Sequence, residues 1–110
     1  MSDAAPGAIA AIYAIFGSDE EARRIGREMV ERRLAACVNI LGACHSIYRW
    51  QGAVEEADEV AAIFKTGQSS AAALMAAIRE AHSYEIPAIT MLSIEGADRD
   101  YRDWVLANHG

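Results

Sequence analysis

The chain has 110 residues, enough for one domain with a core of its own. Apolar residues make up 53% of it and charged residues 24%, a composition typical of a folded globular domain. Its formal net charge of −6 excludes the basic surface with which nucleic-acid-binding proteins neutralise phosphates, so we expect no nucleic-acid partner.

Residues 1–7 carry no basic segment of the kind that opens a secretion signal, and we expect them to be flexible. The apolar run 8–16 is too short to span a bilayer, so we expect no membrane partner and a cytoplasmic location. This run predicts a first strand. The two cysteines, Cys37 and Cys44, form no disulfide pattern and are expected to be free thiols.

The next segment predicts a helix from about Asp19 to Arg33, because apolar residues recur in it at helical spacing. Ser18 and Glu21, three residues apart, form a capping box at its start. Arginines are frequent along this segment and alternate with acidic residues. The pattern indicates a solvated, ion-paired helix face.

The segment from Arg33 to Glu59 predicts a long β-hairpin, interrupted at Gly42 and turning at Gln51-Gly52, with its second arm over about 54–65. The part of the first arm from Ala43 to Trp50 would extend about 26 Å at about 3.3 Å per residue. A two-stranded ribbon is only marginally stable in water. We therefore expect the ribbon to lie against another copy of the chain.

Ser69 or Ser70 is expected to cap a second helix, and Pro87 to open a last strand over 88–94. Asp98 is expected to cap a short terminal helix. The resulting order is β-α-β-β-α-β with a long central hairpin and a short C-terminal helix. This order is the ferredoxin-like plan, an α+β fold, and we expect residues 1–110 to form a single domain.

The predicted strands are apolar on both faces, although helices cover only one face of a ferredoxin-like sheet. In the run 8–16, for example, both alternating sets of side chains are apolar. A large exposed apolar face marks an association surface, so we infer a homo-oligomer with closed symmetry. The alternative is that the terminal helix covers this face.

No motif of a known catalytic site is present, and we expect no enzyme activity. The segment His82-Ser83-Tyr84-Glu85 gathers an imidazole, a phenol and a carboxylate in the loop before the last strand. His82 and Glu85 are candidate ligands for a divalent metal ion, and a thiolate from Cys37 would add affinity for copper or zinc. In the alternative, His82 caps the second helix and Tyr84 packs in an interface.

The remaining polar and aromatic candidates are Lys65, two further histidines and four aromatic side chains. Lys65 either contacts an anion or carboxylate or extends into solvent. His45 is interpreted as a plain strand residue, and His109 is expected to be frayed at the chain end. The aromatic side chains could stack on a ligand, but aromatic residues dominate protein interfaces, so anchoring between subunits is favoured; they are Tyr48, Trp50, Tyr101 and Trp104.

An ordered set of short patterns, spread over about residues 8–106, resembles the CutA divalent-cation tolerance family. The patterns are RLAACVN at Arg33–Asn39, S-x-Y-x-W-x-G at Ser46–Gly52, Glu59, Lys65-Thr66, H-x-Y-E-x-P at His82–Pro87 and Y-x-x-W at Tyr101–Trp104. The resemblance implies a ferredoxin-like homotrimer whose hairpins reach across to neighbouring subunits. It also implies a role in divalent-metal tolerance and association with copper.

Three positions depart from the family pattern. Ser83 replaces a proline, Ala88 stands where a glutamate often follows Pro87, and Ala14 occupies a position at which some members carry a cysteine. Each change removes a feature that would support a metal site.

The sequence therefore favours a cytoplasmic homotrimer that binds a divalent metal, with copper expected and with His82, Glu85 and Cys37 as ligands. Tyr48, Trp50 and Trp104 are its expected trimer anchors. The alternative is a small-molecule sensor of the PII type, which would bind a metabolite between subunits through Lys65, Tyr84 and Glu85. A third possibility is a structural trimer that binds neither metal nor metabolite.

Overall fold

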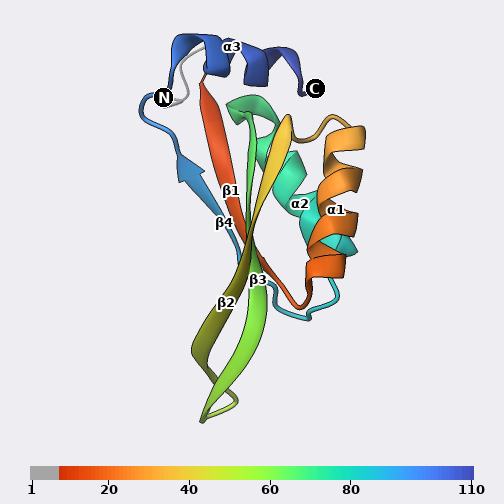
Figure 1. The fold of residues 1–110 in the computed structure, drawn as a ribbon, viewed down its shortest axis with the longest axis vertical. Coiled ribbons are helices and arrows are strands. Elements are labelled where there is room, and N and C mark those ends of the chain that lie inside the picture. Colours follow the sequence, from red (N-terminus) through yellow and green to blue (C-terminus); the bar gives the residue numbers. More distant parts are fainter. Residues whose placement is uncertain (1–7) are drawn as a thin grey trace.

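The computed structural model describes residues 8–110, so the predicted flexibility of residues 1–7 lies outside the described part. Four antiparallel strands form one sheet in the order β2-β3-β1-β4. Helices α1 and α2 cover one face of this sheet, and α3 crosses one end (Figure 1). The α+β ferredoxin-like prediction is confirmed. The elements are β1 (Ile9–Phe16), α1 (Asp19–Glu31), β2 (Cys37–Trp50), β3 (Ala53–Gly67), a 3-10 turn (Gln68–Ser70), α2 (Ala71–Ala81), β4 (Ile89–Ser93) and α3 (Arg99–Ala107).

The core lies between the sheet and the helix pair. Alternate residues of β1 and β3 point toward the helices, and the stripes predicted for α1 and α2 meet them. Its largest members are completely buried: Ile12, Phe16, Ile25, Met29, Phe64, Leu74 and Ile78. A second, smaller cluster joins Ile9 and Ala36 to Val105 and holds α3 on the end of the sheet.

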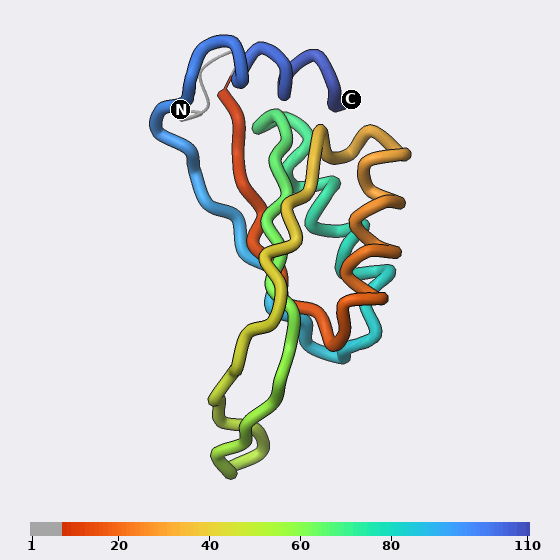
Figure 2. The backbone as a smooth tube through the Cα atoms, in the orientation of Figure 1, coloured from red at the N-terminus to blue at the C-terminus, as the bar shows by residue number. Residues whose placement is uncertain are grey.

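The hairpin of β2 and β3 projects well beyond the rest of the sheet, and its two arms twist around each other (Figure 2). This projection gives the molecule its longest extent, 44 Å. Gln51 and Gly52 both take positive φ at the turn, at 50° and 84°. That conformation is the type I′ hairpin turn, whose twist matches that of the strands.

A β-bulge interrupts the hairpin where the sequence predicted a break. The register shifts between Ile40 and Gly42, and Gly42 has φ of 101°. The extra residue reverses the alternation of every later side chain in β2. Cys37 is therefore paired with Lys65 and Cys44 with Glu59, so both cysteines lie on the same face of the sheet.

Helix α1 ends at Glu31, two residues before the predicted end. Arg33 adopts a left-handed conformation with φ of 60°. Its N–H donates to Val30 O and that of Leu34 donates to Met29 O, the two bonds of a Schellman C-cap. The side chain of Arg33 also donates to the carbonyl oxygens of Ala107 and Gly110, so this residue ties the helix end to the end of the chain.

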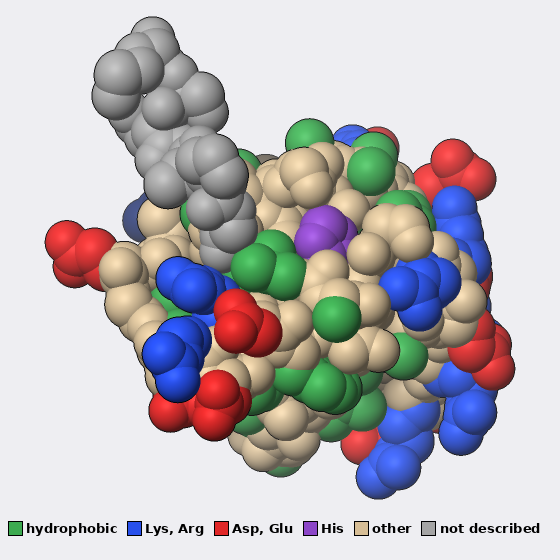
Figure 3. Space-filling model, turned by 90° about the horizontal axis from the view of Figure 1, so that it is seen from above, with side chains coloured by type: hydrophobic (Ala, Val, Ile, Leu, Met, Phe, Trp, Pro, Cys, Tyr) green, Lys and Arg blue, Asp and Glu red, His purple; other side chains and the backbone are tan. Residues whose placement is uncertain are grey.

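The ion-paired face predicted for α1 is confirmed. Three arginines of α1 and its C-cap residue Arg32 lie within 4.0 Å of an acidic residue four positions away: Arg23 with Asp19, Arg24 with Glu20, Arg27 with Glu31 and Arg32 with Glu28. Blue and red side chains alternate along this margin of the molecule (Figure 3). Because these pairs are exposed, each contributes only about 0.3–0.5 kcal/mol of stability.

His109 is not frayed, contrary to the expectation from its position. Its Nδ1 lies 2.8 Å from the hydroxyl of Ser70, and its ring packs over the backbone of Gly67. Ser70 occupies the N-cap position of α2 without bonding the helix, because its hydroxyl is used by His109. Tertiary contact has therefore replaced the predicted local cap.

Gly67→Ala is expected to lower the free energy of unfolding by about 1–3 kcal/mol, since an added Cβ would overlap the His109 ring. In a His109→Ala background, the same change should lower the free energy of unfolding by much less. Gly96→Ala, where nothing lies within 4 Å of the new methyl group, is the matched control. Urea denaturation of the unmodified protein, the two single variants at 67 and 109 and the double variant measures the coupling. Equal losses of stability from Gly67→Ala in both backgrounds would contradict the packing described.

Among residues 8–110, α3 alone covers the face of the sheet opposite α1 and α2, and it does so at one end. Large apolar side chains remain exposed on the molecule, among them Ile47 at 65%, Leu92 at 51% and Trp104 at 46%. In the part of the chain that the structure describes, no helix has the length and apolarity needed to cross a membrane.

Candidate functional site

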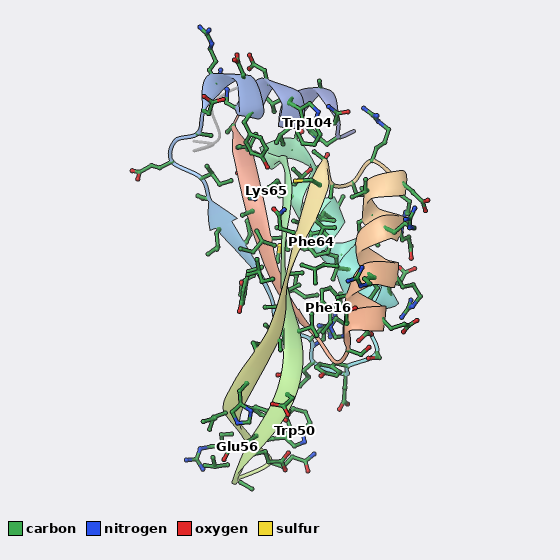
Figure 4. All side chains as sticks on the ribbon, in the orientation of Figure 1. Phe16, Trp50, Glu56, Phe64, Lys65 and Trp104 are labelled. Carbon is green, nitrogen blue, oxygen red and sulfur yellow. The ribbon has the colours of Figure 1, made fainter. Side chains whose placement is uncertain are left out.

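Within residues 8–110, side chains capable of chemistry gather in two main regions and, separately, around His45 on the hairpin. One is the loop between α2 and β4, residues 82–88, where it meets the base of the hairpin. The other is the opposite end of the sheet, beneath α3. Figure 4 shows the separation: Lys65 and Trp104 lie at the α3 end, and Trp50 lies on the projecting hairpin.

His82 is a buried structural histidine at the start of the loop. Its Nε2–H donates to Ile15 O over 2.7 Å, and its Nδ1 accepts the N–H of Tyr84 over 3.0 Å. The ring also stacks on Phe16, with centroids 5.0 Å apart and planes 11° apart. Both ring nitrogens are therefore used within the subunit, in the tautomer that carries its proton on Nε2.

Glu21 holds the same loop from the side of α1. One carboxylate oxygen accepts the N–H of Gly17 over 3.2 Å and the other accepts the N–H of Ser83 over 2.9 Å. Burial would raise the pKa of Glu21, but these hydrogen bonds and the nearby His82 outweigh burial and lower it. The capping box is thus only half formed, because Ser18 caps the helix while Glu21 is directed to Gly17 and the loop.

Tyr84 points from the loop to the hairpin. Its hydroxyl donates to a carboxylate oxygen of Glu59 over 2.7 Å, and Glu59 is only 8% exposed. Burial and this carboxylate together raise the pKa of Tyr84, so the phenol keeps its proton at neutral pH. Loop and hairpin are therefore joined by a hydrogen bond between two side chains that lie far apart in the sequence.

A cleft of about 670 Å³ opens between the hairpin and this loop. Aromatic and acidic side chains come from the hairpin: Tyr48, Trp50, Glu55 and Glu59. The body adds Ile15, Tyr84, Glu85 and Ile86. The bulge at Gly42 is what makes the cleft possible, because it turns Tyr48 and Trp50 to the same face as Glu59.

Cys37, Lys65 and Trp104 lie in the second region. The thiol of Cys37 is 3.5 Å from the hydroxyl of Tyr101, and burial together with this thiol raises the pKa of Tyr101 to about 12. Lys65 donates to the side chain of Asn39 over 3.2 Å and lies 6.0 Å from the centre of the Tyr101 ring. Trp104 stacks on Tyr101 at 6.0 Å. Lys65 thus contacts the α3 end and does not extend freely into solvent.

The predicted metal ligands do not converge within one subunit. His82 packs against Phe16 on the helix-covered side, whereas Cys37 faces α3 on the other side. His82 bonds Ile15 of β1, whereas Cys37 of β2 pairs with Lys65 of β3. Lys65 lies opposite Ala11 of β1, four residues from Ile15, so the two ligands are separated by about 13 Å along the sheet. Within residues 8–110, no group of three or more His, Cys, Asp and Glu side chains is placed to hold a metal ion.

His45 is more than a plain strand residue. Its Nδ1 lies 2.9 Å from Asp58 and its Nε2 lies 2.6 Å from Glu56, on the exposed face of the hairpin. The two carboxylates raise the pKa of His45 above its ordinary value. With both nitrogens donating, the imidazolium bridges the two acids across the strands.

We expect the imidazole of His45 to titrate above its ordinary pKa of about 6.5. Because the folded pKa is raised, the stabilisation of the hairpin is complete below the unfolded pKa and is lost as pH rises through the folded pKa. An NMR titration of the ring protons measures this. The double change Glu56→Gln with Asp58→Asn should return the midpoint to about 6.5, and an unshifted midpoint in the unmodified protein would contradict the bridge.

Two residues of the loop network, Glu21 and Glu59, are absent from the predicted site residues. Glu21 is visible in the sequence only as a helix cap, and Glu59 only as one element of a family pattern. Neither has a local signal that points to the loop before β4. Their roles depend on contacts 62 and 25 residues away along the chain.

A family model, curated relatives and solved structures were compared with this chain, and those reported below are all divalent cation tolerance or CutA proteins. Residues 10–108 match the family model described as CutA1 divalent ion tolerance protein. Mouse Protein CutA is 38% identical over 100 residues, which cover 91% of this chain and 56% of that protein, so the chain spans about half the length of this relative.

Two solved structures are similar in fold and length. The divalent cation tolerance protein of Thermus thermophilus has a TM-score of 0.89 and 39% identity, covering 93% of this chain and 99% of that one. The protein from Archaeoglobus fulgidus, described as a periplasmic divalent cation tolerance protein, has a TM-score of 0.85 and 37% identity, covering 88% and 94%.

Proposed function

The chain belongs to the CutA1 divalent ion tolerance family, and on this basis we propose that it acts in tolerance to divalent cations by binding such a cation as a homotrimer. The proposed role is binding, with no catalytic step. Copper is the proposed metal, because thiolate and imidazole donors of the kind present here favour it over the hard cations.

The metal site is proposed to form between subunits. The donor set of one subunit does not enclose an ion, since the candidate ligands within residues 8–110 lie at opposite ends and faces of the sheet. Glu85 is exposed and Cys37 is half-buried, so both can meet groups of a neighbouring copy. His82 stays a proposed ligand, but its coordination through Nδ1 would require release of the Tyr84 N–H.

Titration calorimetry with copper, on the intact oligomer, tests this proposal. Cys37→Ser and Glu85→Gln are each expected to weaken copper binding about tenfold or more, because each removes one ligand from a small set. Cys44→Ser is the matched control, since Cys44 is the other free thiol and is also half-buried. Unchanged affinity in both ligand variants would exclude the proposed set, and equal loss in the control would show a non-specific thiol effect.

The proposed homotrimer is supported by the exposed apolar surface. In the described part of the chain, the sheet face that α1 and α2 leave open is covered only near α3, and large apolar side chains remain accessible on the sheet and hairpin. Tyr48, Trp50 and Trp104 are proposed as anchors, because aromatic side chains bury large areas at interfaces. Light scattering on a sizing column should give three times the chain mass at micromolar concentration; a monomer would exclude the trimer.

A second candidate function is supported by the cleft. Its volume of about 670 Å³ lies within the range of small-molecule sites, and Tyr84 presents a hydroxyl at its wall. A PII-like sensor would bind a metabolite here, and Lys65 could contribute only across a subunit boundary, since its own subunit holds it at the α3 end. Thermal stabilisation by a ligand with metal chelated distinguishes this function from the first. Failure of both tests would leave a structural trimer.

We also propose a cytoplasmic location. The relative from Archaeoglobus fulgidus is described as periplasmic, so the two compartments are the alternatives to test. Fractionation of cells that express the full-length protein, followed by immunoblotting, decides between them.

A further inference from the structure

The sulfur of Cys37, at the start of β2, lies against a side chain of helix α3. Its distance from the hydroxyl oxygen of Tyr101 is 3.5 Å. Burial and the neighbouring thiol raise the pKa of Tyr101 to about 12, so the phenol keeps its proton at neutral pH. A sulfur that binds a metal ion has lost its own proton. In that state Tyr101 is the donor of this hydrogen bond and Cys37 is the acceptor.

A positive charge lies beside the same sulfur. Lys65 is the cross-strand partner of Cys37 in β3, so the two side chains share one face of the sheet. The ammonium of Lys65 donates to Asn39 and lies 6.0 Å from the centre of the Tyr101 ring. Among residues 8–110 it forms no ion pair with a carboxylate. A phenol donor and an ammonium group without an acidic partner both stabilise the negative charge of a metal-bound sulfur.

Helix α3, which carries Tyr101, is anchored on the sheet mainly by one side chain. Among the described residues of this helix, Val105 is the one that is completely buried. The connection from β4 to α3, residues 94–98, contains neither helix nor strand. An added Cβ at Gly96, within this connection, would meet no atom within 4 Å. The connection therefore does not by itself fix the place of the Tyr101 hydroxyl.

Residues 107–110 fasten the far end of α3 to the helix layer. The side chain of Arg33, after α1, donates to the main-chain oxygens of Ala107 and Gly110 over 3.1 Å each. The N–H of Gly110 donates to Arg33 O over 2.7 Å. His109 Nδ1 lies 2.8 Å from the hydroxyl of Ser70, before α2. The 107–110 segment is thus joined both to the end of α1 and to the start of α2.

We propose that Tyr101 is a positioning residue for the sulfur of Cys37. Its hydroxyl donates to that sulfur when a metal ion is bound, which orients the sulfur and stabilises its charge. Arg33 and the 107–110 segment act through α3, because they keep the Tyr101 hydroxyl within reach of β2. This assignment rests on the proposed role of Cys37 as a metal ligand and names the groups that hold this ligand. The contacts lie within one subunit and persist whichever surfaces the assembly covers.

Raman spectroscopy of the S–H stretching band, with EDTA present, tests the contact itself. The measurement uses the Cys44→Ser protein, in which Cys37 is the remaining thiol. Tyr101→Phe keeps the ring that stacks on Trp104 and removes the hydroxyl, so the band should move to the frequency of a thiol without a hydrogen bond. Tyr13→Phe is the matched control, because the hydroxyl of Tyr13 forms no hydrogen bond among residues 8–110, and the band should stay unchanged.

Titration calorimetry with copper, without oxygen and on the intact oligomer, tests the positioning role. Tyr101→Phe should weaken copper binding about tenfold, since it removes a group that orients a ligand. Arg33→Gly removes two side-chain hydrogen bonds and keeps the left-handed backbone, which glycine adopts readily. It should weaken copper binding less than Tyr101→Phe does and accelerate hydrogen exchange in α3. Arg32→Ala, which removes an exposed arginine paired with Glu28, is its control and should change neither.

The outcomes separate the positioning role from the ligand role. Unchanged copper affinity in Tyr101→Phe, with Cys37→Ser still weakening binding, would overturn the positioning role and keep Cys37 as a ligand. If Cys37→Ser has no effect on copper binding, the ligand role fails and the positioning role fails with it. An unchanged S–H band in Tyr101→Phe would show that the hydroxyl does not contact the sulfur, which would also overturn the assignment.

Two further outcomes concern the 107–110 segment. Faster hydrogen exchange in α3 of Arg33→Gly, with unchanged copper affinity, would remove Arg33 from the assignment. If Arg33→Gly does not fold, Ser70→Ala takes its place, because it releases His109. Ser69→Ala, a change at the exposed neighbouring residue, is then the control. Equal effects of the two serine changes on copper affinity would overturn the role of the segment.

Discussion

Phe16→Ala is expected to lower the free energy of unfolding by about 3–5 kcal/mol, the largest effect of any single change considered. The side chain is completely buried at the end of β1. It packs against Phe64, with ring centroids 6.3 Å apart, and against the His82 ring at 5.0 Å. Truncation leaves a cavity between these two rings and removes the surface on which His82 stacks.

The consequence should reach beyond the core, because His82 holds the loop before β4. Hydrogen exchange at the Tyr84 amide is expected to accelerate in Phe16→Ala, since that N–H is protected by the imidazole that Phe16 supports. Urea denaturation at one fixed protein concentration measures the stability, because the stability of the proposed homotrimer would depend on concentration.

Val30→Ala is the control, because Val30 is 37% exposed on α1 and its truncation leaves no enclosed cavity. Val30→Ala should lower the free energy of unfolding by well under about 1 kcal/mol. A cost for Phe16→Ala no greater than that of Val30→Ala would show that the packing at the end of β1 is not as described.

His82→Ala is expected to lower the free energy of unfolding by about 2–4 kcal/mol, because it removes a buried ring and two hydrogen bonds and leaves two partly buried partners unpaired. Those partners are the carbonyl of Ile15 and the N–H of Tyr84. The change also removes the stacking on Phe16 and the neighbour of Glu21. The loop that carries Tyr84 and Glu85 should therefore loosen.

This result bears on the metal question, because the same residue is a proposed ligand. A structural role predicts loss of stability in the absence of any metal, measured by urea denaturation in EDTA. Glu80→Ala is the control, since Glu80 is exposed on the surface of α2. Unchanged stability of His82→Ala in EDTA would contradict the structural role and leave coordination as the reason for the histidine.

The order of the elements could be predicted because each has a local signal. Ser18 caps α1 and Asp98 caps α3 as expected, through bonds to the N–H groups of Glu21 and Tyr101. The strands follow from apolar runs bounded by Gly and Pro, and the hairpin turn from Gln51-Gly52. Each of these features depends on residues within a few positions of one another, so a short stretch of sequence is enough to predict it.

Positions that depend on distant contacts could not be predicted. Helix α1 ends at Glu31 and not at the predicted Arg33, because Arg33 takes a left-handed conformation and its side chain donates to carbonyl groups 74 and 77 residues away. The hydroxyl of Ser70 contacts His109 and does not cap α2. The direction of Cys37 was open in the sequence, and its contact with Tyr101 of α3 settles it within the subunit.

Local patterns in the chain were enough to identify the fold, the family and the loop in which His82, Tyr84 and Glu85 lie, since alternation, caps and short motifs involve neighbouring residues. What these residues contact became known from the folded molecule alone. The one-residue bulge at Gly42 places Tyr48 and Trp50 on the same face of the hairpin as Glu59. The hydrogen bond from Tyr84 to Glu59 joins the loop to the hairpin. Strand register sets which side chains share a face, and register depends on the pairing of the whole hairpin, so no short segment could have revealed this arrangement.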